Sequence, residues 1–589
     1  MLTGGGTNPR TAAAAGPNGP LSNLADGRAA RSSSYVQLDW GYLFLIIAFA
    51  ALLRIVFFSG ALGTDEIVYL THAYHLLQGD YLPTTYIAAM RDGINAFLAA
   101  SLWLFGKGTA GAGGLFFICS VAQVALSYSF AHHLWGRDTA IWAGITMAVL
   151  PIEVTQAGNL NPDPYLGLVI ASSIVIFYFA QRDDRPALYF AAGLLVGWVF
   201  WIKQVVIICA GVFVLFVLAD RRWRSGWLWF ACGCTVLVAA QFVLFWFVYG
   251  DALYFFRANY TFILQTHIIG NVSDTSLWRY FELLFVKVYH TGLVGWFAVA
   301  ACILALWRGP ESRTLFVLIW GLGLLFIFSA VPISFSPLKF IAKQSNYMDF
   351  FMMPLALLIG WFLAQQRREV ALLLGAAMVV SGVLLAALEQ QVVRVVTVNG
   401  RSAAEFAQAH VGTPVFGPLT AQRQSMLARL LGGSLDSRGD IRPWADLSRL
   451  TPISSSPSDV VAYLVEDPQM RNWPEAPAEK PLTDSLRHCL VPAGSLAVDD
   501  LGLGRSVVAA LHSVFAALPG SYGARALRAL DPLWQVAPAQ VYAVTKECAQ
   551  FAGHSASQTS RRAGPVFTRA KLQQSLVVDP TALRIAAHA

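Results

Sequence analysis

The sequence has few charged residues. Asp, Glu, Lys and Arg make up 13% of its 589 residues, where an ordinary soluble domain has about 25%. This shortage argues against a soluble enzyme. Apolar residues make up 56% of the chain, and they form long blocks rather than the spaced pattern of an amphipathic helix or strand. The composition therefore predicts an integral membrane protein.

Three other signals are absent from the sequence. The seven cysteines include no C-x-x-C pair, which argues against a zinc or iron–sulfur site. The glycine-rich run at 108–114 lacks a following Lys and Ser or Thr, so we interpret it as a linker and not as a nucleotide-binding loop. The net charge is +7, but the basic residues stand at the ends of apolar blocks, which argues against nucleic-acid binding.

The apolar blocks divide the chain into four parts. We expect a disordered cytoplasmic tail at 1–38, a transmembrane domain at 39–390, an extracytoplasmic α/β domain at 391–551 and a flexible tail at 552–589. About eleven blocks are long enough to span a membrane as helices. These blocks lie at 41–58, 114–134, 139–154, 165–180, 188–202, 204–219, 226–248, 291–307, 314–332, 350–364 and 370–388.

Arginines predict the orientation of these helices. Five short loops between the blocks are rich in arginine, and all five would lie on the side of the N-terminal tail. They contain Arg137, Arg182, Arg185, Arg221, Arg222, Arg224, Arg308, Arg313, Arg367 and Arg368. The positive-inside rule makes this side cytoplasmic. The other loops and the C-terminal domain are therefore expected to face the periplasm or the exterior.

The C-terminal region contains no block of spanning length. Short strands separated by helical stretches such as 403–410 and 421–431 predict a small α/β domain. The expected strands lie at 395–398, 414–416, 460–465, 496–498 and 541–545. Cys489 and Cys548 are the cysteines of this region. An exported compartment permits a disulfide between them, and two unpaired thiols are the alternative.

The first outward loop, residues 59–113, has the most informative polar residues. Asp65 and Glu66 begin a stretch with an apolar stripe at helical spacing, which predicts a helix lying in the membrane interface and capped by Thr64 or Asp65. A second such helix is expected at 92–105. One interpretation of the two acids is helix capping. The other is a general base that deprotonates a hydroxyl beside the membrane.

The second outward loop adds a third acid. Asp163 stands in the turn sequence Asn-Pro-Asp-Pro, so it is either a helix cap or an acid that the fold brings close to Asp65 and Glu66. Carboxylates that share a site raise one another's pKa or bind a divalent cation. Mg, Mn or Ca held by these three acids is therefore one expectation.

Basic residues on the same outer face complement these acids. Arg91, Lys203, Lys339 and Lys343 stand near the outer ends of apolar blocks. Each alone is explained by a long side chain that reaches the membrane interface. Together they predict an anion site that stabilises the charge of a departing phosphate. Further candidates for this site are Arg54, Tyr69, His72, His267 and Tyr347.

The order of these residues resembles the lipid-dependent membrane glycosyltransferases of the GT-C class. An arginine near the end of the first helix precedes Asp-Glu, a helix with Tyr and His, and a basic residue before the segment FLAASLWLFG. The segments LVGWVFWIK at 195–203 and KQSNY at 343–347 are similar to segments of the dolichyl-phosphate-mannose-protein mannosyltransferase-like group. This group includes the bacterial aminoarabinose transferases. The resemblance covers about residues 40–390, and Asp92 departs from it because many relatives have proline there.

The resemblance implies a polytopic all-α transmembrane GT-C fold. It also implies transfer of a sugar from a polyprenyl-phosphate donor to the hydroxyl of a lipid, glycan or protein, by a single inverting displacement. Asp65 would be the catalytic base, and Glu66 and Asp163 would support the site or a metal. The residues that would bind the donor phosphate are Arg91, Lys203 and Lys343. A bacterial inner membrane is the expected location.

Two other classes of protein are open alternatives. A lipid-linked sugar flippase or a secondary transporter would also have many helices and isolated charges. Transporters commonly contain internal repeats, however, and the Asp-Glu loop is not repeated in the second half of the chain. A membrane scaffold with an exported domain would explain residues 389–589 but not the charged outer loops. The sequence therefore favours a glycosyltransferase.

Overall fold

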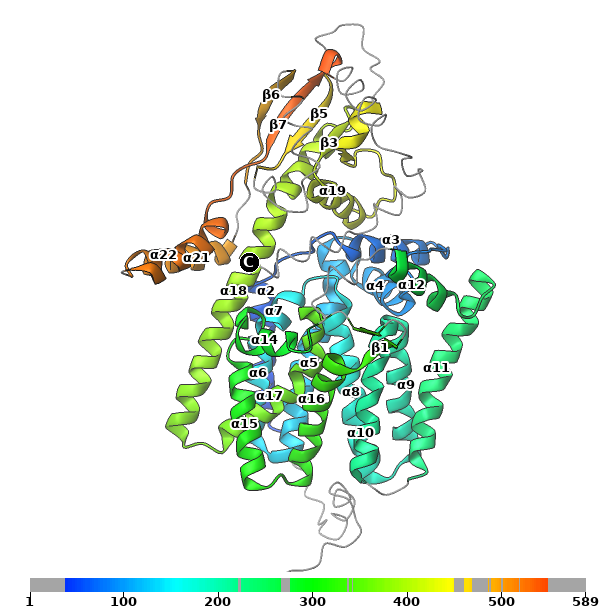
Figure 1. Cartoon of the computed structure of the whole chain (residues 1–589), viewed down its shortest axis with the longest axis vertical. Coiled ribbons are helices and arrows are strands. Elements are labelled where there is room, and N and C mark those ends of the chain that lie inside the picture. The colour runs from blue at the N-terminus through cyan, green and yellow to red at the C-terminus, as the bar shows by residue number, and fades with distance from the viewer. Residues whose placement is uncertain are drawn as a thin grey trace, which may run out of the picture.

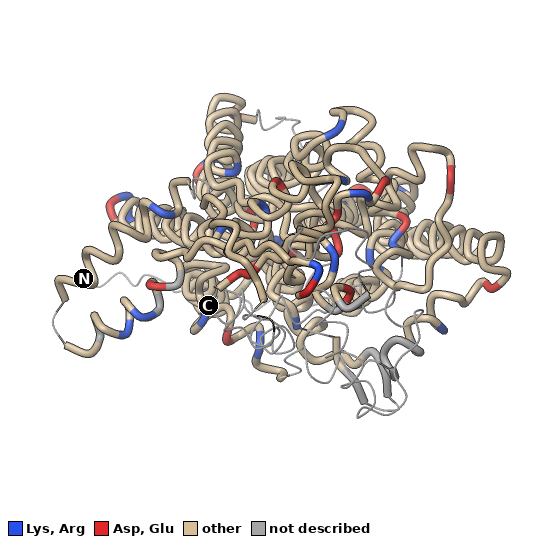
Figure 2. The backbone as a smooth tube through the Cα atoms, turned by 90° about the horizontal axis from the view of Figure 1, so that it is seen from above, with Lys and Arg blue, Asp and Glu red and all other residues tan. Residues whose placement is uncertain are grey.

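The computed structural model describes residues 38–220, 224–265, 276–335, 338–341, 343–449, 460–468, 486, 489–498, 502–518 and 520–548. These residues form a bundle of apolar helices with a small α/β domain at one end (Figure 1). The two predicted tails, apart from residue 38, lie outside the described residues. Figure 2 shows that long stretches of helix carry no charged residue.

Each predicted spanning block coincides with one helix or two consecutive helices. These are α2 (Trp40–Val56), α5 (Thr109–Trp135), α6 (Arg137–Ala148) with α7 (Pro151–Gln156), α8 (Pro162–Asp183), α9 (Pro186–Ile202), η2 (Gln204–Ala210) with α10 (Gly211–Asp220), α11 (Gly226–Tyr249), α15 (Val294–Arg308), α16 (Ser312–Ala330), α17 (Asp349–Ala364) and α18 (Arg368–Ala409). Among the described helices, six are long and apolar enough to cross a membrane. The polytopic fold is confirmed, and the number of about eleven spans stays a prediction.

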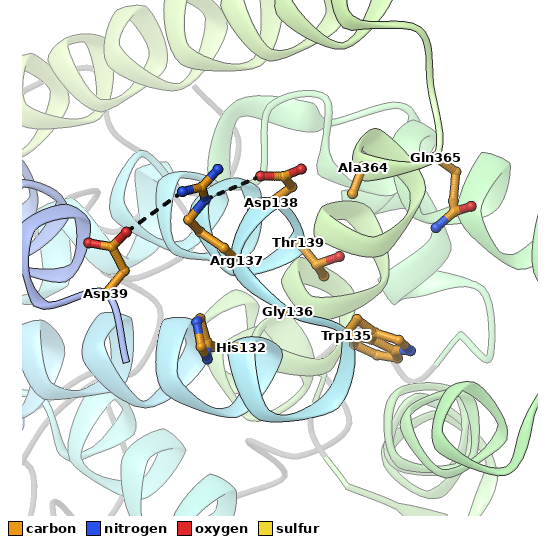
Figure 3. Close-up of a pocket in the computed structure, with 9 residues that line it drawn as sticks. All are labelled: Asp39, His132, Trp135, Gly136, Arg137, Asp138, Thr139, Ala364 and Gln365. Atoms are coloured by element: carbon orange, nitrogen blue, oxygen red, sulfur yellow. Dashed lines mark ion pairs between the residues drawn. The ribbon is translucent and has the colours of Figure 1, made fainter. Parts of the chain in front are cut away.

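The described parts of the five arginine-rich turns lie together at one end of the bundle; Arg221 and Arg222 lie outside the described residues. Hydrogen bonds connect the turns, from Arg182 to His133, from Arg224 to Gln181, from Arg313 to Leu134 and from Arg308 to Gln365. Figure 3 shows Arg137 between Asp39 and Asp138; Gln365, in the turn between α17 and α18, lines the same pocket. The predicted grouping of the basic loops on one side of the membrane therefore agrees with the fold.

Two short helices lie at the opposite end of the bundle. They are α3 (Asp65–Leu77), which runs across this end in Figure 1, and α4 (Asp92–Phe105), which packs against α3, α5 and α9. Both were expected as interfacial helices. The other elements of the membrane region are α12 (Tyr254–Gln265), α14 (Arg279–Phe285), η3 (Val288–His290), the antiparallel strands β1 (Pro332–Phe335) and β2 (Leu338–Phe340), and η4 (Ser345–Met348).

The C-terminal domain contains a five-stranded mixed sheet. Its order is β4-β3-β5-β7-β6, with β3 parallel to β4 and β5, and β7 antiparallel to β5 and β6. The strands are β3 (Val415–Gly417), β4 (Arg442–Pro443), β5 (Val460–Glu466), β6 (Leu490–Ser495) and β7 (Gln540–Thr545). The helices are α19 (Leu419–Leu431), η5 (Trp444–Arg449), α21 (Gly502–Ala516) and α22 (Ser521–Trp534). Cys489 and Cys548 form a disulfide.

Two of the predicted strands are wrong. Residues 395–398 belong to α18, which continues for 42 residues from the bundle into the C-terminal domain and passes through the predicted boundary at 390. The β-branched run there favours a strand locally, but Val395, Val398 and Ala403 are buried on successive helical turns, so tertiary packing overrides this preference. Residues 496–498 follow the end of β6.

Candidate active site

Asp65 lies at the start of α3 and receives hydrogen bonds from three side chains. The Tyr86 hydroxyl donates to Oδ1 over 3.0 Å, while the Tyr69 hydroxyl and Arg91 Nη1 each donate to Oδ2 over 3.3 Å. The Asp65 side chain is still 32% exposed. Asp65 is therefore an oriented carboxylate that a molecule from outside can reach.

The donors around Asp65 keep their protons. Burial raises the pKa of Tyr69 and of Tyr86 well above the usual value, so both phenols stay protonated. Arg91 also donates to the Tyr69 hydroxyl. Burial alone would lower the pKa of Arg91, but Tyr69 and Asp65 raise it overall. Arg91 therefore remains a cation next to the carboxylate.

Glu66 has a different role from its neighbour. Its carboxylate accepts hydrogen bonds from the backbone N–H groups of Leu62 and Thr64 and, over 2.6 Å, from the Thr64 hydroxyl. Thr64 stands at the N-cap position of α3, but its side chain makes no capping bond. The Asp65 oxygens accept from Tyr69, Tyr86 and Arg91 instead, so the predicted side-chain cap by Thr64 or Asp65 is wrong. For Thr64, the reason is that its hydroxyl is directed to Glu66. Glu66 is 5% exposed and fixes the turn that places Asp65.

The C-terminal domain packs on this same turn. Gln424 Nε2 of α19 donates to the Leu62 carbonyl over 2.8 Å. Gly63 has a positive φ of 80°, and a Cβ atom there would lie 3.2 Å from the Arg423 side chain and 3.3 Å from that of Gln424. This position therefore requires glycine, both for its backbone conformation and for the close approach of α19.

Asp163 forms a second, fully buried group with a lysine. Its Oδ1 lies 3.0 Å from Lys203 Nζ, with the side chains 0% and 5% exposed, and its Oδ2 accepts from the Asn346 amide. Asn161 is the residue that caps α8, because its side chain accepts from the Asp163 N–H. The capping interpretation of Asp163 is therefore wrong. The Lys203 ammonium also lies 4.2 Å from the centre of the Tyr347 ring.

The two groups are neighbours. Tyr69 interacts electrostatically with Asp163, and Arg91 with Tyr347. We call the combined set the outer polar cluster; it consists of Asp65, Tyr69, Tyr86, Arg91, Asp163, Lys203, Asn346 and Tyr347. The fold thus brings together the first two outward loops, the end of α9 and the stretch before α17.

The remaining sequence candidates have other surroundings. Lys343 is buried, with Nζ 5.3 Å from the centre of the Phe340 ring. His72 is 8% exposed, and burial followed by repulsion from His75 lowers its pKa to about 4, so it is neutral at neutral pH. His267 and the side chain of Lys339 lie outside the described part of the chain.

Arg54 lies inside the bundle, away from Asp65. Its Nε donates to Ser120 over 2.8 Å and its Nη1 to the Ala148 carbonyl over 3.2 Å. Ser120 in turn donates to the Glu153 carboxylate over 3.1 Å. Arg54 is therefore linked to an acid, Glu153, through Ser120 and takes no part in the contacts around Asp65.

Several residues of the site were not among the sequence candidates. Tyr86 stands in an irregular stretch with no periodicity that would mark it. Asn346 is adjacent to the candidate Tyr347 within the KQSNY segment, and this position was the signal that could have marked it as a site residue. Gln424 could not be found from sequence spacing, because it lies 362 residues from its partner Leu62.

The acids do not form a metal site in the described residues. There, no group of three or more His, Cys, Asp and Glu side chains could hold a metal ion. Asp65 is engaged by two phenols and an arginine, Asp163 by a lysine and an amide, and Glu66 by the turn. Each oxygen of Asp65 and of Asp163 thus already accepts a hydrogen bond, and binding of Mg, Mn or Ca by these acids stays a prediction.

A pocket of about 580 Å³ lies at the arginine-rich end of the bundle. Its lining includes Asp39, His132, Arg137 and Asp138 (Figure 3). It is therefore on the opposite side of the membrane region from the outer polar cluster and plays no part in that site.

Comparison with known proteins agrees with the GT-C resemblance. Residues 93–246 match the family model described as dolichyl-phosphate-mannose-protein mannosyltransferase. The fold is similar to that of ArnT from Cupriavidus metallidurans in the apo state (TM-score 0.50) and bound to undecaprenyl phosphate (TM-score 0.51). Both are 16% identical to this chain and cover 78% of it and 97% of their own length.

A second protein of known structure and the curated proteins are further points of comparison. An oligosaccharyltransferase from Archaeoglobus fulgidus has a TM-score of 0.43 at 11% identity, over 74% of this chain and 70% of its own. No curated protein matches the chain in sequence. The protein is therefore a multi-pass membrane protein of the GT-C fold whose residues 93–246 match the dolichyl-phosphate-mannose-protein mannosyltransferase family.

Proposed function

We propose that this protein is a glycosyltransferase that moves a sugar from a polyprenyl-phosphate donor to an acceptor hydroxyl at the outer face of the membrane. The acceptor is a lipid, a glycan or a protein. The observation that carries the proposal is the outer polar cluster, where an accessible carboxylate lies beside the partly buried Arg91 and near the buried Lys203. The family match over 93–246 and the similarity to ArnT bound to undecaprenyl phosphate support it.

Asp65 is the proposed general base. Among the three candidate acids Asp65, Glu66 and Asp163, it is the most exposed, at 32% of its side chain, whereas Glu66 and Asp163 are 5% and 0% exposed. A carboxylate has about four acceptor positions, and three are used by Tyr69, Tyr86 and Arg91. The remaining position can accept the proton of a hydroxyl group.

The reaction is a single displacement at the anomeric carbon. The acceptor oxygen forms a bond to this carbon as its proton passes to Asp65. The bond from the carbon to the phosphate oxygen breaks, and polyprenyl phosphate leaves with the electron pair. Attack opposite the departing phosphate inverts the configuration of the sugar.

Arg91 and Lys203 are the proposed phosphate ligands, with Lys343 at the same outer end. Lys203 gives one N–H to Asp163 and has two more to offer, so Asp163 positions the ammonium. Cations in a partly dehydrated site stabilise the negative charge of a departing phosphate much better than they would in water. No step requires a metal ion.

The proposed setting is a bacterial inner membrane. The arginine-rich end would face the cytoplasm under the positive-inside rule, with the N-terminus on that side. The outer polar cluster and the C-terminal domain would then face the periplasm or exterior. The donor would enter sideways from the lipid, which requires no nucleotide site.

Transfer of labelled sugar tests this function. Membranes containing wild type, Asp65→Asn or Asp80→Asn are supplied with radiolabelled polyprenyl-phosphate sugars. Asp80 is a matched control, because it lies in the same loop, is 63% exposed and pairs with His75. We expect transfer by wild type and Asp80→Asn, and a loss of about 10²- to 10⁴-fold in Asp65→Asn, the usual contribution of a general base.

Two results would contradict the proposal. Normal turnover by Asp65→Asn would remove Asp65 as the base. Movement of labelled donor across reconstituted vesicles without transfer to any acceptor would instead identify a flippase or transporter.

A further inference from the structure

The helices α21 and α22 form a hairpin that leaves the C-terminal domain sideways. They pack against each other, and α21 also packs against α18. Figure 1 shows the pair beside α18, extending away from the helix bundle and below the five-stranded sheet. The hairpin takes no part in the outer polar cluster.

Contacts with α18 fix the position of the hairpin along the length of that helix. Gln391 Nε2 donates to the Leu533 carbonyl over 2.8 Å. Gly504 of α21 meets α18 so closely that a Cβ atom there would lie 2.8 Å from the Ala387 carbonyl oxygen. Both ends of the hairpin are therefore held at residues 387–391 of α18.

Residues 387–391 of α18 lie at the outer boundary of the membrane region. The neighbouring residue Gln390 donates to the carbonyls of Val56 and Phe58, where the apolar block of α2 ends. The apolar block of α18 at 370–388 ends at the same level. Two helices that enter the membrane thus reach its outer surface where the hairpin is attached.

The surface of the hairpin combines apolar and basic side chains. Leu503, Val514 and Leu518 are 55%, 57% and 48% exposed. The charged residues within 502–534 are three exposed arginines and one acid, Asp531, which lies 3.4 Å from His512. The arginines are Arg505, Arg525 and Arg528. In α22, apolar and polar residues are strongly separated onto opposite faces.

We propose that the α21–α22 hairpin binds the outer leaflet of the membrane that the protein's own helices span. Its exposed apolar side chains enter the boundary between headgroups and acyl chains, and its arginines bind the phosphates of anionic lipids. A basic amphipathic helix has this preference because apolar burial and attraction to anionic headgroups act together. This inference is independent of the proposed enzymatic activity.

Photocrosslinking in lipid nanodiscs tests the hairpin position. A benzophenone amino acid replaces Val514 in one full-length sample and Val411 in another. Val411 is a matched control of the same residue type, 61% exposed, beyond the end of α18 and about 30 Å of helix from Gln390. The nanodiscs contain phosphatidylcholine and phosphatidylglycerol. After irradiation, we expect lipid adducts in at least tenfold excess at position 514.

The charge requirement is tested in the same samples. Arg525→Glu with Arg528→Glu should abolish any excess of phosphatidylglycerol in the adducts at position 514. Arg438→Glu, at a side chain 86% exposed elsewhere in the domain, should leave the excess unchanged. Equal adduct yields at 514 and 411, or adducts at 514 with a second copy of the protein, would overturn the proposal. A lipid preference that survives the double charge reversal would overturn the role of the arginines.

Discussion

At the residue scale, the two cations of the outer polar cluster differ in the burial of their ion-pair partners. Arg91 pairs with Asp65, whose side chain is 32% exposed, and Lys203 pairs with the fully buried Asp163. Removing one partner of a buried pair leaves an uncompensated charge and costs about 3–5 kcal/mol. Removing Lys203 alone would therefore destabilise the fold as well as weaken the proposed donor binding, and the two effects need separate tests.

A double substitution at the Lys203–Asp163 pair achieves this separation. We expect Lys203→Met to lower both the thermal unfolding midpoint and the affinity for donor. Lys203→Met with Asp163→Asn should recover the midpoint, because no buried charge remains and the asparagine oxygen still accepts from Asn346. Donor affinity should stay low. The measurements are thermal unfolding in detergent and binding of labelled donor; recovered affinity in the double variant would assign Lys203 a purely structural role.

Asp92, at the start of α4, gives a pH-dependent prediction. Burial raises its pKa from 3.8 to about 6, although the hydrogen bond from Tyr81 opposes the shift. A raised carboxyl pKa stabilises the fold below the unfolded value, and this contribution is lost as pH rises through about 6. The cost at neutral pH is about 3 kcal/mol, at 1.36 kcal/mol per pKa unit.

Asp92→Asn should therefore raise the thermal midpoint at pH 8 and leave it unchanged near pH 4. The asparagine oxygen can still accept the 3.0 Å bond from Tyr81. Asp138→Asn is the control, because its side chain is 77% exposed and it should give the same midpoint as wild type at both values. A uniform shift at both pH values would show that Asp92 titrates normally.

The residue types of the site were predictable from the sequence, but their pairing was not. Asp65, Arg91, Asp163 and Lys203 stand at the ends of apolar blocks, which is a one-dimensional signal. Their partners Tyr86 and Asn346 depend on how loops fold over the bundle, which periodicity does not encode. The placement of Glu66 on the Leu62–Thr64 turn likewise follows from local backbone geometry.

At the scale of elements, α19 connects the C-terminal domain to the turn before Asp65. On the side of the C-terminal domain, this turn is held by the bond from Gln424 to the Leu62 carbonyl and by the close contact at Gly63. Glu66 holds the same turn through bonds from the turn's own backbone N–H groups. The orientation of Asp65 therefore depends on a helix that lies far away in the sequence.

Gln424→Ala tests this dependence. Loss of the bond leaves a carbonyl unsatisfied at a cost of about 1–3 kcal/mol, and we expect kcat to fall about tenfold with KM for the donor nearly unchanged. Gln422→Ala is the matched control, because Gln422 lies on the same helix, is equally buried and bonds to Gly417 within the domain. Equal kcat values in the two variants would show that α19 does not position Asp65.

Elements with a long apolar block were predicted well, and short polar elements less well. The blocks at 226–248 and 314–332 correspond closely to α11 and α16. The run at 395–398 was misassigned because its β-branched residues favour a strand, whereas burial along the continuous helix α18 decides the structure. Local preference is weak compared with packing over several turns.

At the scale of the whole molecule, the outer polar cluster lies at one end of the helix bundle. The arginine-rich turns lie at the opposite end, bound to one another by hydrogen bonds. The proposed reaction, with a lipid-linked donor entering from the side and an acceptor from outside, needs this asymmetry. The polytopic helical bundle and the grouping of the arginine-rich turns at one end were the most predictable features, because spanning length and loop charge are both direct properties of the sequence.

The continuous helix α18 has a mechanical consequence. It is 42 residues long, or about 63 Å at 1.5 Å per residue, and it passes without a break from the arginine-rich end to the sheet. A spanning helix tilts more when the bilayer is thinner. Because α18 is rigid, such a tilt would swing its outer half like a lever and shift α19 relative to Gly63. We therefore expect the thickness of the surrounding bilayer to influence the geometry around Asp65, which would make membrane composition a variable of the site itself.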